Sequence, residues 1–161
     1  MVKKEKKVTR IDPVRTTQPL EQTQEKRVCA YCRISTDSED QKHSLEAQVA
    51  YYSRLIGERN NWIFSGIYAD EDRSGTKLNG RDEFQKMIQD CRRGQHDYII
   101  TKSVTRFARN TVDSIQAIRE LKALGIGIYF EKERVDTLSE KSEQLLTILS
   151  SIAQGESENI S

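Results

Sequence analysis

The sequence predicts an α/β domain: a central, mostly parallel sheet of four to five strands, flanked by helices and followed by a C-terminal helix. Three observations predict this class. β-type apolar runs alternate along the chain with segments of helical period. The length of 161 residues suits one domain with a single sizeable core. Polar segments follow the first three strand-like runs, where an open α/β sheet places its ligands.

Each element has its own local signal. Compact apolar runs predict strands at Arg27–Arg33, Trp62–Ala69, Asp97–Thr101 and Ile126–Phe130. Helical spacing of apolar residues predicts helices from a Ser44 cap to Gly57, from Asn79 to Gly94, and from Val112 to Gly125. Thr137 and Glu140 form a capping box, which predicts a last helix along Leu145, Leu149 and Ile152.

Composition divides the chain into two parts. Residues 1–26 carry a net charge of +3 and almost no apolar periodicity, which predicts a flexible basic leader. A solvated tail is favoured there over an arm that touches DNA phosphates. Residues 27–161 carry a net charge of −2, so any polyanion must be bound by local placement of arginines.

Localisation is predicted from what the sequence contains. No apolar run approaches the ~18 residues of a membrane span, and the lysine-rich start lacks the apolar region of a secretory signal. Three cysteines without such a signal indicate a reducing, cytoplasmic setting.

The candidate site begins at the end of the first strand. Strand alternation places Tyr31, Arg33 and Ser35 on one face, and a hydroxyl beside a fixed guanidinium suits attack on a phosphate. Arg106 and Arg109 follow another strand at helical spacing. We expect these arginines to converge with Ser35 around an anion.

Two other constellations compete. Cys29 and Cys32 form a C-x-x-C, but both lie within a strand and face opposite sides, so they are interpreted as core residues rather than a redox or metal pair. The run Asp70–Asp72 could hold magnesium in a nuclease, although a solvated turn is the simpler interpretation. Neither His43 nor His96 lies in an obvious ligand spacing.

At this point the chain resembles the serine recombinase family, which includes the resolvases, the invertases and the large serine integrases. Tyr31-Cys32-Arg33-Ile34-Ser35 resembles the Y-x-R-x-S nucleophile motif, and the segment from Lys102 to Asn110 resembles the second arginine motif, D-R-x-x-R. Further matching stretches, in family order, are Ser44–Gln48, Ser74–Thr76 with Arg81 and Phe84, and Glu156–Glu158. The Ser-Leu-Glu-Ala-Gln and Arg-Phe-Ala-Arg-Asn stretches are most similar to large transposon-type members.

The resemblance implies a resolvase-like domain over residues 27–161 that acts as a site-specific DNA recombinase. Ser35 would attack a DNA phosphodiester and form a 5′-phosphoserine link, with Arg33, Arg106 and Arg109 neutralising the phosphate. The resemblance implies supporting or phosphate-binding roles for Arg81, Lys102, Thr105, Tyr31 and Gln48. It also implies a bacterial protein that needs no cofactor or metal, a homodimer on each of two DNA sites, and a tetramer in the synapse.

Two departures from the family qualify this. Thr105 stands where many members carry aspartate, so the residue that transfers the proton is left open. The chain stops at Ser161, which we interpret as truncation in or near the long C-terminal helix, before the DNA-binding domains. A metal-dependent nuclease using Asp70–Asp72 and a catalytically degenerate dimerisation module are the alternatives.

Overall fold

The computed structural model describes residues 24–35, 40–72, 81–108 and 110–158, without the side chains of residues 35, 40–44, 72 and 156–158. In chain order the elements are β1 (Lys26–Ser35), α1 (Asp40–Gly57), β2 (Trp62–Asp72), α2 (Asp82–Arg92), β3 (Tyr98–Thr101), α3 (Val104–Phe107), α4 (Thr111–Ala123), β4 (Gly127–Phe130), β5 (Val135–Asp136) and α5 (Lys141–Glu158). The predicted α/β class is confirmed.

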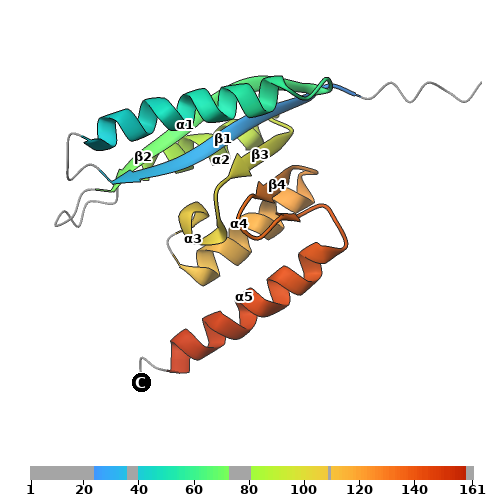
Figure 1. Ribbon diagram of the computed structural model, residues 1–161. Coiled ribbons are helices and arrows are strands. Elements are labelled where there is room, and N and C mark those ends of the chain that lie inside the picture. Colours follow the sequence, from blue (N-terminus) through green and yellow to red (C-terminus); the bar gives the residue numbers. More distant parts are fainter. Residues whose placement is uncertain (1–23, 36–39, 73–80, 109, 159–161) are drawn as a thin grey trace, which may run out of the picture.

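The strands form one five-stranded sheet in the order β2-β1-β3-β4-β5, parallel except for the antiparallel last pair. Helix α1 lies along β1 and β2 on one face, while α2, α3 and α4 lie on the other (Figure 1). Two clusters of buried residues follow this division, because successive strand residues face opposite sides. Cys29 and Tyr31 pack toward α2, α3 and α4, whereas Val28, Ala30 and Cys32 pack toward α1.

The first two strands project beyond the rest of the sheet. Strand β3 ends at Thr101, which pairs with Tyr31, while β1 and β2 stay paired as far as Ser35 and Asp72. At ~3.3 Å per residue, Ser35 lies about 13 Å further along β1 than Tyr31. The sequence prediction ended β1 at Arg33 and made Asp70–Asp72 a loop. Both were wrong, because each strand extends by pairing with the other.

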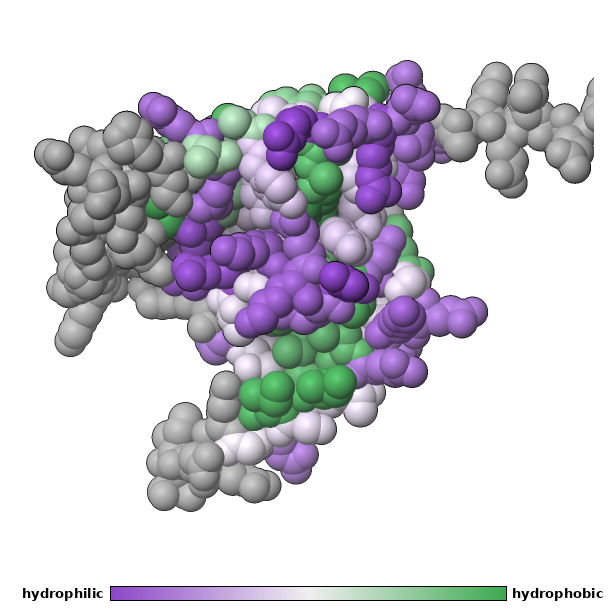
Figure 2. Space-filling view, in the orientation of Figure 1, coloured by the Kyte–Doolittle hydropathy of each residue, from purple (hydrophilic) through white to green (hydrophobic). Residues whose placement is uncertain are grey.

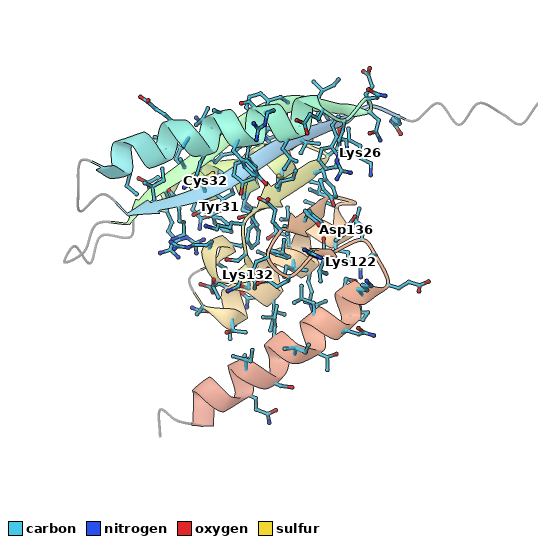
Figure 3. All side chains as sticks on the ribbon, in the orientation of Figure 1. Lys26, Tyr31, Cys32, Lys122, Lys132 and Asp136 are labelled. Carbon is cyan, nitrogen blue, oxygen red and sulfur yellow. The ribbon has the colours of Figure 1, made fainter. Side chains whose placement is uncertain are left out.

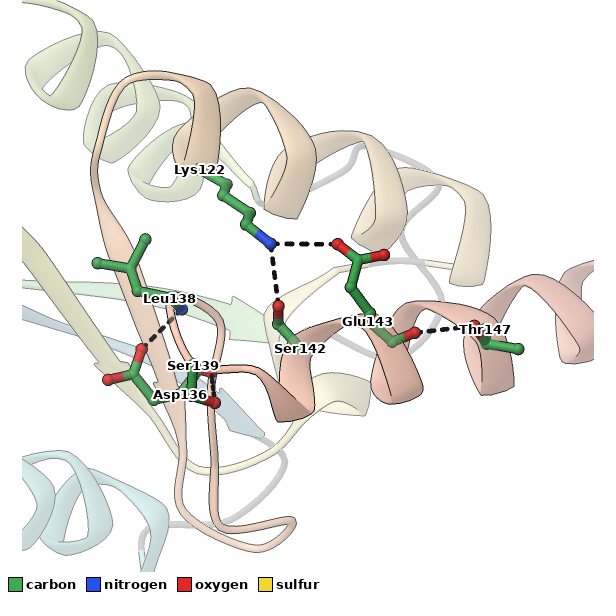
Figure 4. Close-up of polar contacts among 7 residues, drawn as sticks. All are labelled: Lys122, Asp136, Leu138, Ser139, Ser142, Glu143 and Thr147. Carbon is green, nitrogen blue, oxygen red and sulfur yellow. Dashed lines mark hydrogen bonds and ion pairs between the residues drawn. The ribbon is translucent and has the colours of Figure 1, made fainter.

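Helix α5 packs on α4, the layer furthest from α1 (Figure 1). Its first turn is held by Lys122 of α4, whose ammonium donates to Ser142 Oγ at 3.0 Å and pairs with Glu143 at 3.2 Å (Figure 4). Leu146 and Leu149 are buried against the body of the domain. One side of this helix is therefore buried within the domain itself.

Two predicted helix caps were wrong. Helix α1 begins at Asp40, so Ser44 is inside it rather than at its start. Thr137 is buried four residues before α5 begins, and its hydroxyl oxygen accepts a hydrogen bond from Ile128 N at 2.8 Å. It completes the edge of β4 instead of capping a helix.

Parts of the predicted organisation lie outside the described residues. These are most of the expected leader, the Ser74–Thr76 segment, Asn79 and Arg109. The expected leader also included Lys26, which is the first residue of β1. Within the described ranges, no helix is long and apolar enough to cross a membrane.

Candidate active site

A buried carboxylate, Asp70, organises the carboxyl ends of β1 and β2. Its Oδ1 accepts a hydrogen bond from Glu83 N at 3.0 Å, and its Oδ2 accepts one from Phe84 N at 3.0 Å. Tyr31 Oη donates to the same Oδ2 at 2.8 Å. A carboxylate on the free amides of a helix N-terminus is a favourable arrangement, so Asp70 fixes the start of α2 against the sheet.

The phenol of Tyr31 stays protonated in this arrangement. Burial raises its pKa most, and the hydrogen bond to Asp70 and its charge raise it further, while Arg81 lowers it. The ring lies edge-on to Phe84, with centroids 5.2 Å apart. Tyr31 therefore acts as a rigid donor that holds Asp70.

Arg81 joins α2 to α3. Its Nη2 donates to the carbonyl oxygen of Phe107 at 2.5 Å, and its guanidinium lies 4.2 Å from the centroid of the Phe84 ring. Its Nε is buried and has no partner among the described residues. Arg81 therefore links the start of α2 to the end of α3, and its implied role in supporting the site stays a prediction.

The second arginine motif begins on the short helix α3. Helix α3 ends at Phe107, and Ala108 is extended with φ −132° and ψ 160°. Arg109 lies outside the described residues, so the helical spacing expected for Arg106 and Arg109 stays a prediction. Arg106 is exposed on α3, and α3 packs against β1 through Phe107, whose ring centroid lies 6.3 Å from that of Tyr31.

Thr105 is also exposed on α3. Its hydroxyl lies 3.0 Å from that of Ser103, which is buried. Arg33 is half-buried near the end of β1. It lies two residues beyond Tyr31, whose place on β1 is labelled in Figure 3. These residues thus lie on elements at the carboxyl edge of the sheet: Tyr31 and Arg33 on β1, Arg81 directly before α2, and Thr105 and Arg106 on α3.

Two predicted supporting residues lie elsewhere. Gln48 and Lys102 line a groove of about 390 Å³ between α1 and the ends of β3 and β4, on the α1 side of the sheet. The structure brings these two together, but not with Tyr31 and Arg81.

The two competing groups of residues, the cysteine pair and the acidic run, have different surroundings in the structure. Cys29 and Cys32 are both buried and free, in opposite clusters, which agrees with a core role. Burial is the main cause that raises the pKa of both thiols, that of Cys32 to about 12, so neither is an activated thiolate. In the acidic run, Asp70 is occupied by three donors, an arrangement that serves α2 rather than a metal ion.

Sequence reasoning missed two residues of this region. Asp70 was considered only as a turn or metal residue, because its partners lie 13, 14 and 39 positions away and leave no local pattern. Glu131, which accepts a hydrogen bond from Tyr51 Oη at 2.7 Å, directly follows β4 and was not singled out. The position of Glu131 directly after a buried strand could have marked it as a candidate site residue.

Comparison with known proteins adds to this geometry. Residues 28–161 match the family model of the resolvase N-terminal domain. The Transposon Tn3 resolvase of Escherichia coli is 29% identical over 134 residues, which are 83% of this chain and 65% of that protein. A resolvase of Clostridium perfringens is 33% identical, over 81% of this chain and 64% of that protein. The chain thus spans about 65% of the length of these relatives.

Two solved structures of proteins with related names are also similar to this chain over most of its length. The N-terminal catalytic domain of TP901-1 integrase is similar with a TM-score of 0.60 and 29% identity, over 83% of this chain and 98% of that one. A resolvase family site-specific recombinase from Streptococcus pneumoniae is similar with a TM-score of 0.66 and 25% identity, over 83% and 91% of the two chains.

Proposed function

Because the chain belongs to the resolvase N-terminal domain family, the catalytic domain of the serine recombinases, we propose that it breaks and rejoins DNA at specific sites, with Ser35 as nucleophile. The observation that carries this proposal is the placing of the two arginine motifs. Arg33 and Ser35 end β1 at the carboxyl edge of the sheet, and α3, which bears Arg106, packs against the same strand.

In the proposed reaction, Ser35 Oγ forms a bond to phosphorus while the bond from phosphorus to the deoxyribose 3′-oxygen breaks. Arg33, Arg106 and Arg109 neutralise the non-bridging oxygens as charge develops, which is electrostatic stabilisation by preorganised donors. The phosphoester link to Ser35 conserves the energy of the broken bond. Attack by a 3′-hydroxyl then restores the DNA backbone without ATP or a metal ion.

The supporting residues take roles that follow from their contacts. Tyr31 and Arg81 hold α2 and α3 in place around Asp70 and Phe107. Thr105 lies beside Arg106 on α3 and can orient it only through hydrogen bonds.

We further propose that the protein works as a homodimer on each DNA site and as a tetramer in the synapse, through α5. Ile148 and Ile152 are 59% and 47% exposed on this helix. They border a groove of about 400 Å³ between α5 and the α3–α4 region, and Figure 2 shows hydrophobic side chains gathered along α5. An exposed apolar stripe of this kind fits the same stripe on a second copy.

The remaining proposals concern the subtype of recombinase, the cell compartment and the source of the protein. The Arg-Phe-Ala-Arg-Asn sequence favours a large transposon-type recombinase that excises and inserts mobile elements. The three cysteines are free, which favours the reducing cytoplasm, and similarity to bacterial resolvases favours a bacterial source.

The test uses protein that contains this whole chain, on a plasmid carrying two candidate sites, with chelator present throughout. Wild-type protein is expected to give recombined plasmid and, after denaturation in detergent, protein covalently joined to DNA. Ser35→Ala is expected to give neither while still binding DNA. Cutting that appears only when magnesium is added would support the nuclease alternative. Wild-type protein inactive on every two-site plasmid would support the degenerate module.

A further inference from the structure

The loop between β4 and β5 separates its own charges. Residues 131–134, which we call the β4–β5 loop, connect this antiparallel pair of strands and read Glu-Lys-Glu-Arg. The two acids are engaged within the domain. Glu131 accepts a hydrogen bond from Tyr51 Oη of α1 at 2.7 Å, and Glu133 Oε1 accepts one from Val104 N of α3 at 3.4 Å. The carboxylates of the loop are therefore directed toward α1 and α3.

The two cations of the β4–β5 loop face solvent. Lys132, labelled in Figure 3, and Arg134 are both exposed, and neither forms an ion pair with any residue that the structure describes. The Lys132 amide donates to the carbonyl oxygen of Lys102 at 2.8 Å, so a third exposed cation lies on the neighbouring backbone. Cations gathered in this way repel one another, and a polyanion would relieve that repulsion.

Arg134 has a backbone conformation that its side chain disfavours. Its φ is +54°, in the left-handed region, where glycine carries no steric penalty and other residues do. In the described ranges it is the only residue other than glycine with a positive φ. Strain of this kind is typical of residues whose side chains serve function. The arginine is therefore favoured here for what its side chain binds, since the backbone alone would favour glycine.

The β4–β5 loop lies at the same edge of the sheet as the candidate active site. It directly follows the carboxyl end of β4, and only β3 separates β4 from β1, which bears Arg33 and Ser35. Neighbouring strands are about 4.8 Å apart, so β4 lies about 10 Å from β1. This separation corresponds to about three nucleotides along one strand of duplex DNA.

We propose that Lys132 and Arg134 bind the phosphate backbone of duplex DNA, a few nucleotides from the phosphate that Ser35 attacks. The inference rests on the proposed function, which brings DNA to this edge of the sheet. Lysine pairs with a phosphate as a point charge, and arginine can donate two N–H groups to it at once. Such contacts fix the position of the DNA on the protein without reading its sequence.

Fluorescence anisotropy with this chain and two short duplexes of unrelated sequence tests the proposal. Lys132→Ala and Arg134→Gly are each expected to weaken the affinity for both duplexes by about fivefold at about 0.1 M salt. Each should also reduce the slope of log affinity against log salt by about 0.9, the value for one phosphate contact. Arg134→Gly should keep or raise the denaturation midpoint, because glycine relieves the left-handed backbone. Arg134→Lys retains the charge and should retain the affinity.

The matched control removes a lysine from the opposite edge of the sheet. Lys26 is exposed at the amino end of β1, and Lys26→Ala should leave the affinity and the salt slope unchanged. Adduct formation gives a second measurement. Lys132→Ala should need more DNA to reach half of the maximal rate and should reach the same maximal rate, because its contact is equally strong before and during the reaction.

Wild-type affinity and salt slope in both Lys132→Ala and Arg134→Gly would overturn the proposal, as would an equal loss of affinity in Lys26→Ala. The result can be separated from the recombinase proposal. Protein that forms the Ser35-dependent DNA adduct, but whose loop variants bind DNA as wild type does, contradicts the β4–β5 loop alone. Protein whose loop variants lose affinity as expected, but which forms no adduct, supports the loop and contradicts the recombinase.

Discussion

Asp70 shows how one side chain can support a site without entering its chemistry. The carboxylate joins three elements, because it accepts hydrogen bonds from Tyr31 on β1 and from the first amides of α2 while belonging to β2. It is 5% exposed, so water cannot replace those donors. The position of Arg81, and through it of α3, depends on this anchor.

Asp70→Ala is therefore expected to lower the free energy of unfolding by about 2 to 4 kcal/mol, since it leaves buried donors without an acceptor. Urea denaturation measures the change. Glu46→Ala on the exposed face of α1 is the control and should change the free energy of unfolding by less than about 0.5 kcal/mol. Equal effects from the two substitutions would mean that Asp70 does not anchor α2.

At the residue scale, the sequence predicted what depends on strand alternation. The opposite orientations of Cys29 and Cys32 followed from it and are confirmed. The sequence could not predict contacts between positions that lie far apart in the chain. The convergence of Arg33, Arg106 and Arg109 around Ser35 stays a prediction, because the Ser35 side chain and all of Arg109 lie outside the described residues.

At the scale of elements, β2 contains an irregularity that creates a buried polar network. The register with β1 shifts between Val28 and Cys29, which leaves Ser65 as an extra residue, followed by Gly66 at φ +148°. Ser65 Oγ lies 2.7 Å from His96 Nδ1, and the His96 Nε2 lies 2.6 Å from Tyr68 Oη.

The hydrogen bonds of this network fix the state of His96. Tyr68 Oη donates to Asp90 Oδ2 at 2.6 Å, so His96 Nε2 donates to the Tyr68 oxygen and Nδ1 accepts from Ser65. Burial is the largest influence on the pKa of His96 and lowers it from 6.5, outweighing the opposing charge of Asp90. The folded domain thus favours neutral His96.

This predicts a pH dependence of stability. The pKa of His96 is lower in the folded than in the unfolded chain, so its contribution is complete above about pH 6.5 and is lost as the pH falls below that value. Urea denaturation between pH 7.5 and 5 should show a falling free energy of unfolding in wild-type protein. The fall should be smaller in His96→Gln, and an identical fall in both would contradict the assignment.

The sequence located most elements, but local capping signals misled it at two of them. Ser44 and Thr137 have the right residue types for helix caps. However, α1 begins before Ser44, and the Thr137 hydroxyl accepts a hydrogen bond from an amide of β4. A hydroxyl can satisfy a sheet amide as well as a helix amide, and only tertiary packing decides between them. The short helix α3 was missed because four residues are too few to show a period.

At the scale of the whole molecule, the alternation of strands and helices was enough to predict a layered, mostly parallel sheet. It was not enough to predict the strand order or the projection of β1 and β2 past β3, because both depend on pairing between distant segments. Packing of α5 on α4 buries Leu146 and Leu149 but leaves Ile148 and Ile152 exposed. That exposed side is the surface proposed for a second copy.

Ile148→Glu is expected to weaken self-association by at least tenfold, since it places a charge in an apolar interface. Sedimentation equilibrium over a range of protein concentrations measures the change. Gln144→Glu adds the same charge at an exposed position of α5 and should leave self-association unchanged. Wild-type protein that stays monomeric at every concentration, with and without DNA, would contradict a dimer through α5.

The central claim is that Ser35 becomes covalently linked to DNA, and mapping that link tests it most directly. Protein containing this chain would be incubated with site DNA and chelator, denatured, digested with protease and nuclease, and analysed by mass spectrometry. We predict a nucleotide joined through its 5′-phosphate to Ser35, in a peptide that wild-type protein yields and Ser35→Ala does not. A link at another residue, or an adduct that survives in Ser35→Ala, would contradict the account.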